Sequence, residues 1–230
     1  MNIITIGDLH GSPAWKQIQP GDWDRMVFIG DYVDSFEYSD DEIMQNLMEI
    51  LDLKNTFPAK VVLLWGNHDL AYFYGGHPRH YCSGFRKSMR SSLYSLYTSN
   101  AKLFSAAFQI DGYLWTHAGI VGDWYESNIR EEAKTVDDNL AATLNRLFLD
   151  YYEPLFQVSW IRGGMHQYGG IFWAHSSETK EDPLKGYHQI VGHTKTRSGV
   201  LVENHYGNNT SIAFVDCLDT SEEFYKLIVE

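Results

Sequence analysis

The stretch Val61–Asp69 reads VVLLWGNHD, and the interpretation of the whole chain starts from it. Five apolar residues end abruptly at a glycine, and three polar side chains follow. An apolar run of this length that stops at a turn residue is typical of a buried β-strand. Asparagine, histidine and aspartate can bind metals or move protons. The stretch therefore predicts a buried strand whose carboxyl end is followed by residues that can bind a metal or transfer a proton.

Other short apolar runs repeat this pattern along the chain. Helical spacing of apolar residues follows the capping candidates Ser39 and Asp40, and it recurs over residues 140–148. Strands that alternate with helices in the first third favour βαβ units with parallel strands, and the strands near the end predict a mixed portion. The predicted strands are 3–6, 26–29, 61–65, 113–116, 189–191, 212–215 and 224–229.

Five of these strands end in a glycine or its near neighbour together with aspartate, asparagine or histidine. The clusters are Gly7-Asp8-Leu9-His10, Gly30-Asp31-Tyr32-Val33-Asp34, Gly66-Asn67-His68-Asp69, His117-Ala118-Gly119 and Gly192-His193-Thr194. Because the carboxyl ends of parallel strands meet at one edge of a sheet, the clusters can converge. Each motif alone has an ordinary explanation, such as a turn residue or a helix N-cap. Five motifs that agree favour one site.

The residue types in these clusters indicate a dinuclear metal centre. Carboxylate, imidazole and amide ligands without a thiolate suit manganese, iron or zinc. Two ions about 3.5–4 Å apart would hold a bridging hydroxide that attacks phosphorus and would neutralise the phosphoryl oxygens. We therefore expect two divalent metal ions, with Mn²⁺ as the first choice and Fe or Zn²⁺ as alternatives.

Composition and charge restrict the class of protein. The chain has 230 residues, of which 44% are hydrophobic and 21% charged, as in ordinary globular domains. The net charge of −12 argues against general nucleic-acid binding, although bound cations can invert the local field at a phosphate site. The start of the chain lacks the features of a secretory signal, and no apolar run is long enough for a membrane span. A cytoplasmic protein without nucleic-acid or membrane partners is expected.

We expect a single domain over residues 1–230, because the chain shows no repeat and no linker. Two segments fit the strand–helix alternation poorly, namely residues 71–100 and 151–186. Long excursions from a compact domain often carry function, so both could wall the site; surface decoration is the alternative for any single residue there.

With these motifs, the sequence resembles the calcineurin-like metallophosphoesterases. More narrowly, it resembles their phosphoprotein-phosphatase branch, which includes lambda phage phosphatase and the bacterial diadenosine tetraphosphate hydrolases. The motifs run from Gly7 to Thr194 and so cover most of the chain. The resemblance implies an α/β fold, a four-layer α/β/β/α sandwich of two mixed sheets, with the dinuclear metal site at the carboxyl ends of the strands.

The resemblance also implies a role for each matching residue. Asp8 and His10 would hold the first metal, Asp31 would bridge both metals, and Asn67, His117 and His193 would complete the second. His68 would be the general acid that protonates the leaving oxygen, and Asp34 would orient His68 and raise its pKa.

The sequence departs from the pattern of the branch at the phosphate-binding arginines. Asp34 is followed by Ser35, where the branch has Arg-Gly, and GNHD stands where most members have GNHE. Arg162, in a Trp-Ile-Arg stretch, and His175, in GGIFWAH, are the candidate substrate-binding residues. A structural ion pair is the alternative role for Arg162. Arg86 and Arg90 are further candidates for the missing clamp.

The predicted function is hydrolysis of phosphomonoesters. A serine/threonine protein phosphatase is the first choice, with phosphotyrosine as a further substrate. Its partner would be a phosphorylated protein or a small phosphate ester. One alternative is a dinucleoside polyphosphate hydrolase, because the aromatic-rich segments can stack on adenine. The other is a non-catalytic binding protein, which the complete set of expected ligands disfavours.

Overall fold

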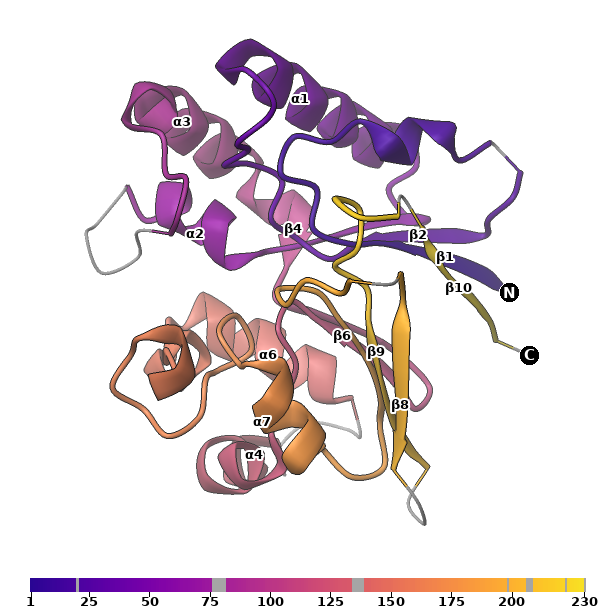
Figure 1. Cartoon of the computed structure of the whole chain (residues 1–230), viewed down its shortest axis with the longest axis vertical. Helices are drawn as coiled ribbons and strands as arrows, with labels where there is room; N and C mark the ends of the chain where they lie inside the picture. Colours follow the sequence, from indigo (N-terminus) through magenta and orange to yellow (C-terminus); the bar gives the residue numbers. More distant parts are fainter. Residues whose placement is uncertain are drawn as a thin grey trace. The chain divides into compact units, whose positions relative to one another are not determined.

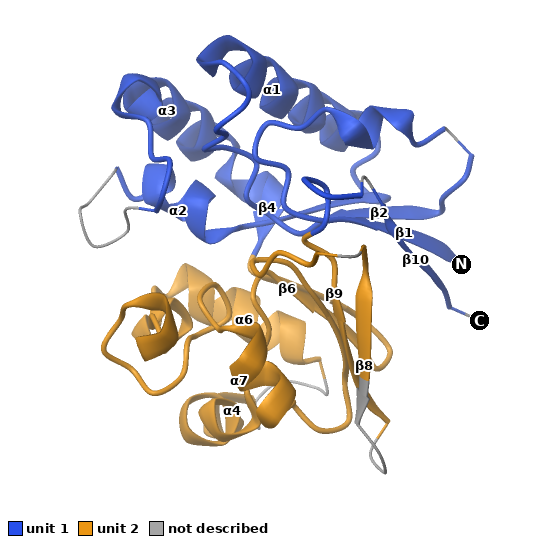
Figure 2. Cartoon of the chain, in the orientation of Figure 1, with its two compact units in different colours: residues 1–105, 217–230 blue, residues 106–216 orange. Residues whose placement is uncertain are grey.

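A computed structural model describes residues 1–19, 21–75, 82–133, 139–197, 199–205, 209–221 and 223–229. The chain divides into two compact units, the first formed by residues 1–105 with 217–230 and the second by residues 106–216 (Figure 2). Each unit contains one mixed sheet of five strands, as the predicted α/β class requires. The single domain expected over residues 1–230 stays a prediction.

The sheet of the first unit has the strand order β10-β1-β2-β3-β4. Neighbouring strands from β1 to β4 run parallel, and β10 pairs antiparallel with β1. Helices α1 and α3 lie over one face of this sheet (Figure 1). The elements of this unit are β1 (Asn2–Ile6), η1 (Ala14–Gln17), β2 (Arg25–Phe28), α1 (Asp40–Thr56), β3 (Val61–Leu64), α2 (Asn67–Phe73), η3 (Lys87–Met89), α3 (Arg90–Asn100), η4 (Ala101–Leu103), β4 (Phe104–Ser105) and β10 (Tyr225–Ile228).

Helix α1 begins where its sequence predicts. The Ser39 side chain accepts the backbone N–H of Glu42, and the Glu42 carboxylate accepts the backbone N–H of Ser39, which completes a capping box. Ile43, Leu47 and Ile50 recur at helical spacing and are fully buried. The helix thus buries one apolar stripe and exposes its polar face.

The sheet of the second unit has the strand order β5-β6-β7-β9-β8. The pairs β6–β7 and β7–β9 are parallel, and the outer pairs β5–β6 and β8–β9 are antiparallel. Helices α4, α6 and α7 lie together on one face of it (Figure 1). The elements of this unit are β5 (Ala107–Ile110), β6 (Tyr113–Thr116), α4 (Gly122–Asn128), α5 (Arg130–Ala133), α6 (Leu140–Leu149), η5 (Glu153–Phe156), η6 (Trp160–Arg162), α7 (Ser176–Glu181), β7 (His188–Val191), β8 (Leu201–His205) and β9 (Thr210–Phe214).

The two predicted excursions contain helices. Residues 71–100 include the end of α2 and the whole of α3, while residues 76–81 lie outside the described part of the chain. Residues 151–186 hold η5, η6 and α7 between irregular stretches. Within the described residues, no helix combines the length and the apolar character that a membrane crossing needs.

Candidate metal and active site

The three polar clusters of the first unit emerge from one edge of its sheet. The register places Ile6 beside Phe28 and Phe28 beside Leu63, so the parallel strands β1, β2 and β3 end side by side. The residues that follow these strands are the predicted ligands and the predicted acid–base pair, listed in chain order as Asp8, His10, Asp31, Asp34, Asn67 and His68. The convergence predicted for the first three clusters is therefore present within this unit.

The backbone at this edge is strained at the functional positions. His10, Asp31 and Asp34 all lie in the left-handed region, with φ of 45°, 53° and 67°. Residues other than glycine seldom adopt such angles, and they cluster at sites where surrounding structure imposes them. In the second unit, His193 has φ of 63°. Four predicted site residues thus share a conformation that is costly by itself.

Glycine is needed at the turn after β3 because two backbones touch there. A Cβ atom on Gly66 would lie 2.2 Å from Oδ1 of Asp31 and 2.3 Å from its backbone nitrogen. Gly66 itself has φ of −107°, which any residue can adopt. The sequence suggested that Gly66 makes a sharp turn, and the structure gives a different reason for it: close approach to Asp31.

Asp69 ties the end of β2 to the start of α2. Its Oδ2 accepts the backbone N–H of Asp31 at 2.8 Å and that of Gly66 at 2.9 Å. Its Oδ1 accepts the backbone N–H of Tyr32 at 3.0 Å and the hydroxyl of Tyr97 at 2.6 Å. Burial, together with the charge of Asp31, raises the pKa of the Asp69 carboxyl to about 7. All four contacts are donated to Asp69, so this network favours the carboxylate form and holds Asp31 in its strained conformation.

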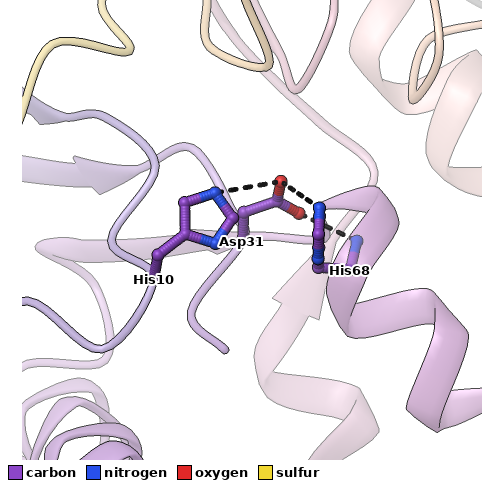
Figure 3. Close-up of side chains that lie close together, drawn as sticks. All are labelled: His10, Asp31 and His68. Atoms are coloured by element: carbon purple, nitrogen blue, oxygen red, sulfur yellow. Dashed lines mark hydrogen bonds and ion pairs between the residues drawn. The ribbon is translucent and has the colours of Figure 1, made fainter. Parts of the chain in front are cut away.

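The Asp31 carboxylate lies between two histidine rings (Figure 3). Its Oδ1 accepts the backbone N–H of His68 at 2.9 Å, at the start of α2. Its Oδ2 is 4.0 Å from Nε2 of His10 and 3.9 Å from Nε2 of His68. One oxygen is therefore fixed by the protein, and the other faces both imidazoles at distances longer than a hydrogen bond.

The tautomer of His10 suits a metal ligand. Its Nδ1 lies 2.9 Å from the carbonyl oxygen of Val33, so Nδ1 carries the proton and Nε2 presents its lone pair toward Asp31. Burial lowers the pKa of His10, against the opposing effect of the Asp31 charge. A lone pair and a carboxylate oxygen that face each other across about 4 Å leave the space of two metal–ligand bonds.

The donor set of the first unit fits divalent cations. Ligand atoms of His10, Asp31 and His68 lie within 4.8 Å of one another. Asp8, Asp31, Asp34 and Asp69 are each no more than 2% exposed, and so many buried carboxylates at one strand edge are costly unless cations or donors compensate them. Asp8 is not part of the cluster formed by the described ligand atoms, although it is buried directly after β1.

His68 and Asp34 form the predicted pair. Nδ1 of His68 lies 2.9 Å from Oδ2 of Asp34. Burial by itself lowers the pKa of His68, but the Asp31 charge and the Asp34 hydrogen bond outweigh it, and the net effect is a raised pKa. Oδ1 of Asp34 accepts the hydroxyl of Tyr72, whose own pKa is raised by burial and by the Asp34 charge. Nδ1 of His68 is therefore held by Asp34, and Nε2 faces Asp31.

Asn67 is the first residue of α2, and it is buried. Its amide Nδ2 donates to the Cys82 sulfur at 3.2 Å. Cys82 is a half-buried free thiol, and burial raises its pKa. Sequence reasoning did not connect Cys82 with the site, because nothing in the local pattern places it there.

The two histidine clusters of the second unit also meet at one sheet edge. Strands β6 and β7 are parallel, and the Gly192 N–H donates to the His117 carbonyl at 2.8 Å. The His117 and His193 rings lie 5.1 Å apart, edge to face. Gln189 holds the loop after His117 through two hydrogen bonds to the backbone of Ile120, at 2.8 and 3.0 Å. The second unit thus brings its two predicted ligands, His117 and His193, close together at one sheet edge.

Arg162 lies beside one of these ligands. Its Nη2 donates to Oγ1 of Thr194 at 2.6 Å and to the His193 carbonyl at 3.1 Å. It is close enough to His175 to contribute, after burial, to lowering the pKa of that ring. His175 caps helix α7: its Nδ1 accepts the backbone N–H of Ser177 at 3.2 Å. The structure therefore gives His175 a structural task, and its predicted role in substrate binding stays a prediction.

The turn after Asp34 is held from inside the protein. The Ser35 side chain is buried, and its hydroxyl accepts the backbone N–H groups of Glu37 and Tyr38, each at 3.0 Å. The Arg86 guanidinium donates to the carbonyls of Ser35 and Tyr38 and pairs with Asp40. Arg86 therefore supports this turn from inside the protein. This structural role makes Arg86 a weaker candidate for the missing phosphate-binding arginine.

Arg90 has a similar structural contact. Its Nε donates to the carbonyl oxygen of Gly75 at 2.8 Å. Neither of the two further arginine candidates is therefore favoured over Arg162, whose guanidinium lies next to a predicted metal ligand.

A sequence model of the calcineurin-like phosphoesterases matches residues 1–197. The chain belongs to this family. Among solved structures, this phosphoesterase is similar to a protein serine/threonine phosphatase from Saccharomyces cerevisiae with similarity to human phosphatase PP5, at a TM-score of 0.50 and 17% sequence identity. The likeness covers 96% of the phosphoesterase and 69% of the yeast chain, and it shows the fold. No curated protein gives a significant sequence match.

Family membership confirms the predicted class of enzyme, a phosphoric ester hydrolase, and the resemblance on which it rested. The family is metal-dependent, and the first unit brings the candidate ligands His10 and Asp31 together with His68, the predicted acid. Sequence reasoning missed Tyr72 and Tyr97. Tyr72 follows His68 by four residues on α2, so helical spacing contained a signal that the two side chains share a face.

Proposed function

We propose that this phosphoesterase hydrolyses phosphomonoesters, with phosphoserine and phosphothreonine in cytoplasmic proteins as its main substrates and phosphotyrosine as a further one. The observation that carries the proposal is the His68–Asp34 hydrogen bond of 2.9 Å, with the far side of the His68 ring facing Asp31. A histidine held in this way beside candidate metal ligands is suited to protonate a leaving oxygen.

The roles of the chain's own residues follow from this arrangement. His68 gives a proton from Nε2 to the departing ester oxygen, and Asp34 keeps Nδ1 protonated and stabilises the charged imidazolium before transfer. Asp69 holds Asp31 and the start of α2 in place through backbone hydrogen bonds.

The metal ligands are assigned by the family resemblance and supported by the donor chemistry. Asp8 and His10 would hold one ion, Asp31 would be shared, and Asn67, His117 and His193 would hold the other. Two Mn²⁺ ions, when bound, supply a nucleophile from water and offset the charge of the phosphoryl oxygens. Arg162 would bind a phosphate oxygen; the hydrogen bond from its guanidinium to the His193 carbonyl supports this role.

A second candidate function is hydrolysis of a dinucleoside polyphosphate. The observation in its favour is the side chain of Trp160, which is 63% exposed two residues before Arg162 and could stack on a base. Against it, Tyr72 and Tyr97 of the aromatic-rich segment 71–100 are fully buried, so they are not available for stacking.

The acid role is tested with Mn²⁺-loaded wild type and His68→Ala on phenyl phosphate, whose leaving group needs a proton. We expect kcat to fall by roughly 100-fold or more in His68→Ala. His166→Ala is the control, because His166 is a partly exposed surface histidine. Equal kcat for wild type and His68→Ala would contradict the assignment.

The substrate class is tested by comparing phosphoserine and phosphothreonine peptides with diadenosine tetraphosphate under the same conditions. A higher kcat/KM for the peptides supports the proposal. Faster turnover of the dinucleotide, reduced in Trp160→Ala, would favour the second candidate instead.

A further inference from the structure

Tyr72 sits behind the His68–Asp34 pair, on the same face of helix α2 as His68. It is fully buried, and its ring stacks on Phe85 with 4.5 Å between ring centroids and 18° between planes. The Tyr72 hydroxyl donates to Oδ1 of Asp34 and accepts the backbone N–H of Arg86 at 2.8 Å. The stacking contact and the two hydrogen bonds hold the phenol in place, with its proton directed at the Asp34 carboxylate.

The two oxygens of Asp34 have different partners as a result. Oδ2 faces Nδ1 of His68 at 2.9 Å, and Oδ1 takes the Tyr72 hydroxyl. Asp34 needs such support, because its backbone lies in the left-handed region at φ of 67° and its side chain is 1% exposed. Without the phenol, Oδ1 would be left buried without this donor, and the carboxylate would be free to turn away from His68.

We propose that Tyr72 is a positioning residue for catalysis, which fixes the Asp34 carboxylate and through it the orientation and tautomer of His68. This inference rests on the proposed function, in which His68 is the acid. Tyr72 does not reach the substrate. Its contribution is that Nε2 of His68 points toward the leaving oxygen and that Nδ1 keeps its proton.

The first test is the dependence of the rate on the leaving group in Mn²⁺-loaded Tyr72→Phe. On phenyl phosphate, which needs the proton from His68, we expect kcat to fall roughly tenfold relative to wild type. On p-nitrophenyl phosphate, whose leaving group is stable as an anion, the fall should be much smaller. Tyr152→Phe is the matched control, because its hydroxyl donates to the Asn128 carbonyl in the other unit, at 3.0 Å. Equal losses on both substrates would overturn the inference.

The second test separates this inference from the proposed function. If Tyr72 acts through His68, Tyr72→Phe should cause no further loss on phenyl phosphate in a His68→Ala background. If the two losses multiply, Tyr72 acts by another route and the inference fails, while the acid role of His68 stands. If His68→Ala alone has no effect, the proposed function fails first and the inference falls with it.

A spectroscopic measurement that does not depend on catalytic turnover tests the inference even if Tyr72→Phe folds poorly. In metal-free wild type, proton NMR should show a downfield Nδ1–H resonance from His68, which moves or broadens in Tyr72→Phe. Asp34→Asn keeps Tyr72 intact and should remove the same resonance. An unchanged His68 resonance in folded Tyr72→Phe, or in Asp34→Asn, would overturn the inference.

Discussion

The carboxylate of Asp69 accepts the backbone N–H of Asp31 at 2.8 Å, so the last residue of the GNHD motif fixes the first aspartate of the preceding motif. The two residues are 38 positions apart in the sequence: Asp31 follows β2, and Asp69 lies in the first turn of α2, which follows the neighbouring parallel strand β3. The contact explains how a non-glycine residue at φ of 53° is maintained, and why two strand-end motifs act as one structural unit.

Asp69→Asn should destabilise the protein and weaken metal binding. An amide replaces one acceptor oxygen by a donor, so a backbone N–H in this buried network would lose its partner, at about 2–4 kcal/mol of unfolding free energy. Urea denaturation of the metal-free protein measures this loss, and titration calorimetry with Mn²⁺ measures the affinity. Asp52→Asn, on the exposed face of α1, is the control. Wild-type stability in Asp69→Asn would show that the network is not needed.

Gly66→Ala should perturb the site by steric contact alone, because it adds a methyl group and no polar group. The new Cβ would lie 2.2 Å from Oδ1 of Asp31, so the turn or the carboxylate must move. We expect a loss of about 2 kcal/mol or more in unfolding free energy and weaker Mn²⁺ binding. Gly112→Ala is a matched control, because its nearest neighbour, Cδ2 of His188, would be 3.9 Å away. If both variants behave alike, the close approach at Gly66 is not a constraint.

Ser35→Arg should not restore a phosphate clamp. The Ser35 hydroxyl accepts two backbone N–H groups from inside the turn, and its carbonyl accepts the Arg86 guanidinium. An arginine would remove both hydroxyl contacts and could not occupy the buried space of the serine, so stability should fall and the KM for p-nitrophenyl phosphate should not improve. A lower KM with unchanged stability would contradict this description of the turn. Steady-state kinetics and thermal unfolding measure the two effects.

Arg162→Ala should weaken phosphate binding. If Arg162 binds a phosphate oxygen, the inhibition constant for inorganic phosphate and the KM for phosphate esters should each rise about tenfold. Its contacts with Thr194 and the His193 carbonyl suggest the other reading, a purely structural role. In that case Mn²⁺ affinity would fall, and the inhibition constant for phosphate would not change in the fully loaded enzyme. Arg146→Ala, at a surface ion pair, is the control.

The strands that carry the site were predictable because each is a continuous apolar run that ends at polar residues. The predicted strands 3–6, 26–29 and 61–65 differ from β1, β2 and β3 by a residue at their ends. Strands β4, β5 and β8 were missed. Strand β4 has two residues and no periodicity, while β5 (AFQI) and β8 (LVENH) mix polar and apolar residues at the two edges of their sheet.

The sequence of helix α3 contains a helical spacing of buried residues that its many serines and tyrosines made hard to recognise. Its sequence, RSSLYSLYTSN, was interpreted as part of an excursion, yet Leu93 and Tyr97 stand four residues apart and are both buried. The partners of the site were harder to predict. Tyr97 contacts Asp69, and Tyr72 contacts Asp34, only because tertiary packing brings them together. The sequence pattern therefore predicted the candidate ligands but not the residues that position them.

The central claim is that the strand-end residues hold metal ions that enable phosphoester hydrolysis. The most direct test is p-nitrophenyl phosphate hydrolysis by metal-stripped protein, before and after Mn²⁺ is added, in wild type and in Asp31→Asn. We predict no activity without metal, recovery of wild type with Mn²⁺, and at least about 100-fold lower activity in Asp31→Asn. Full activity in the stripped protein, or equal recovery in Asp31→Asn, would contradict the claim.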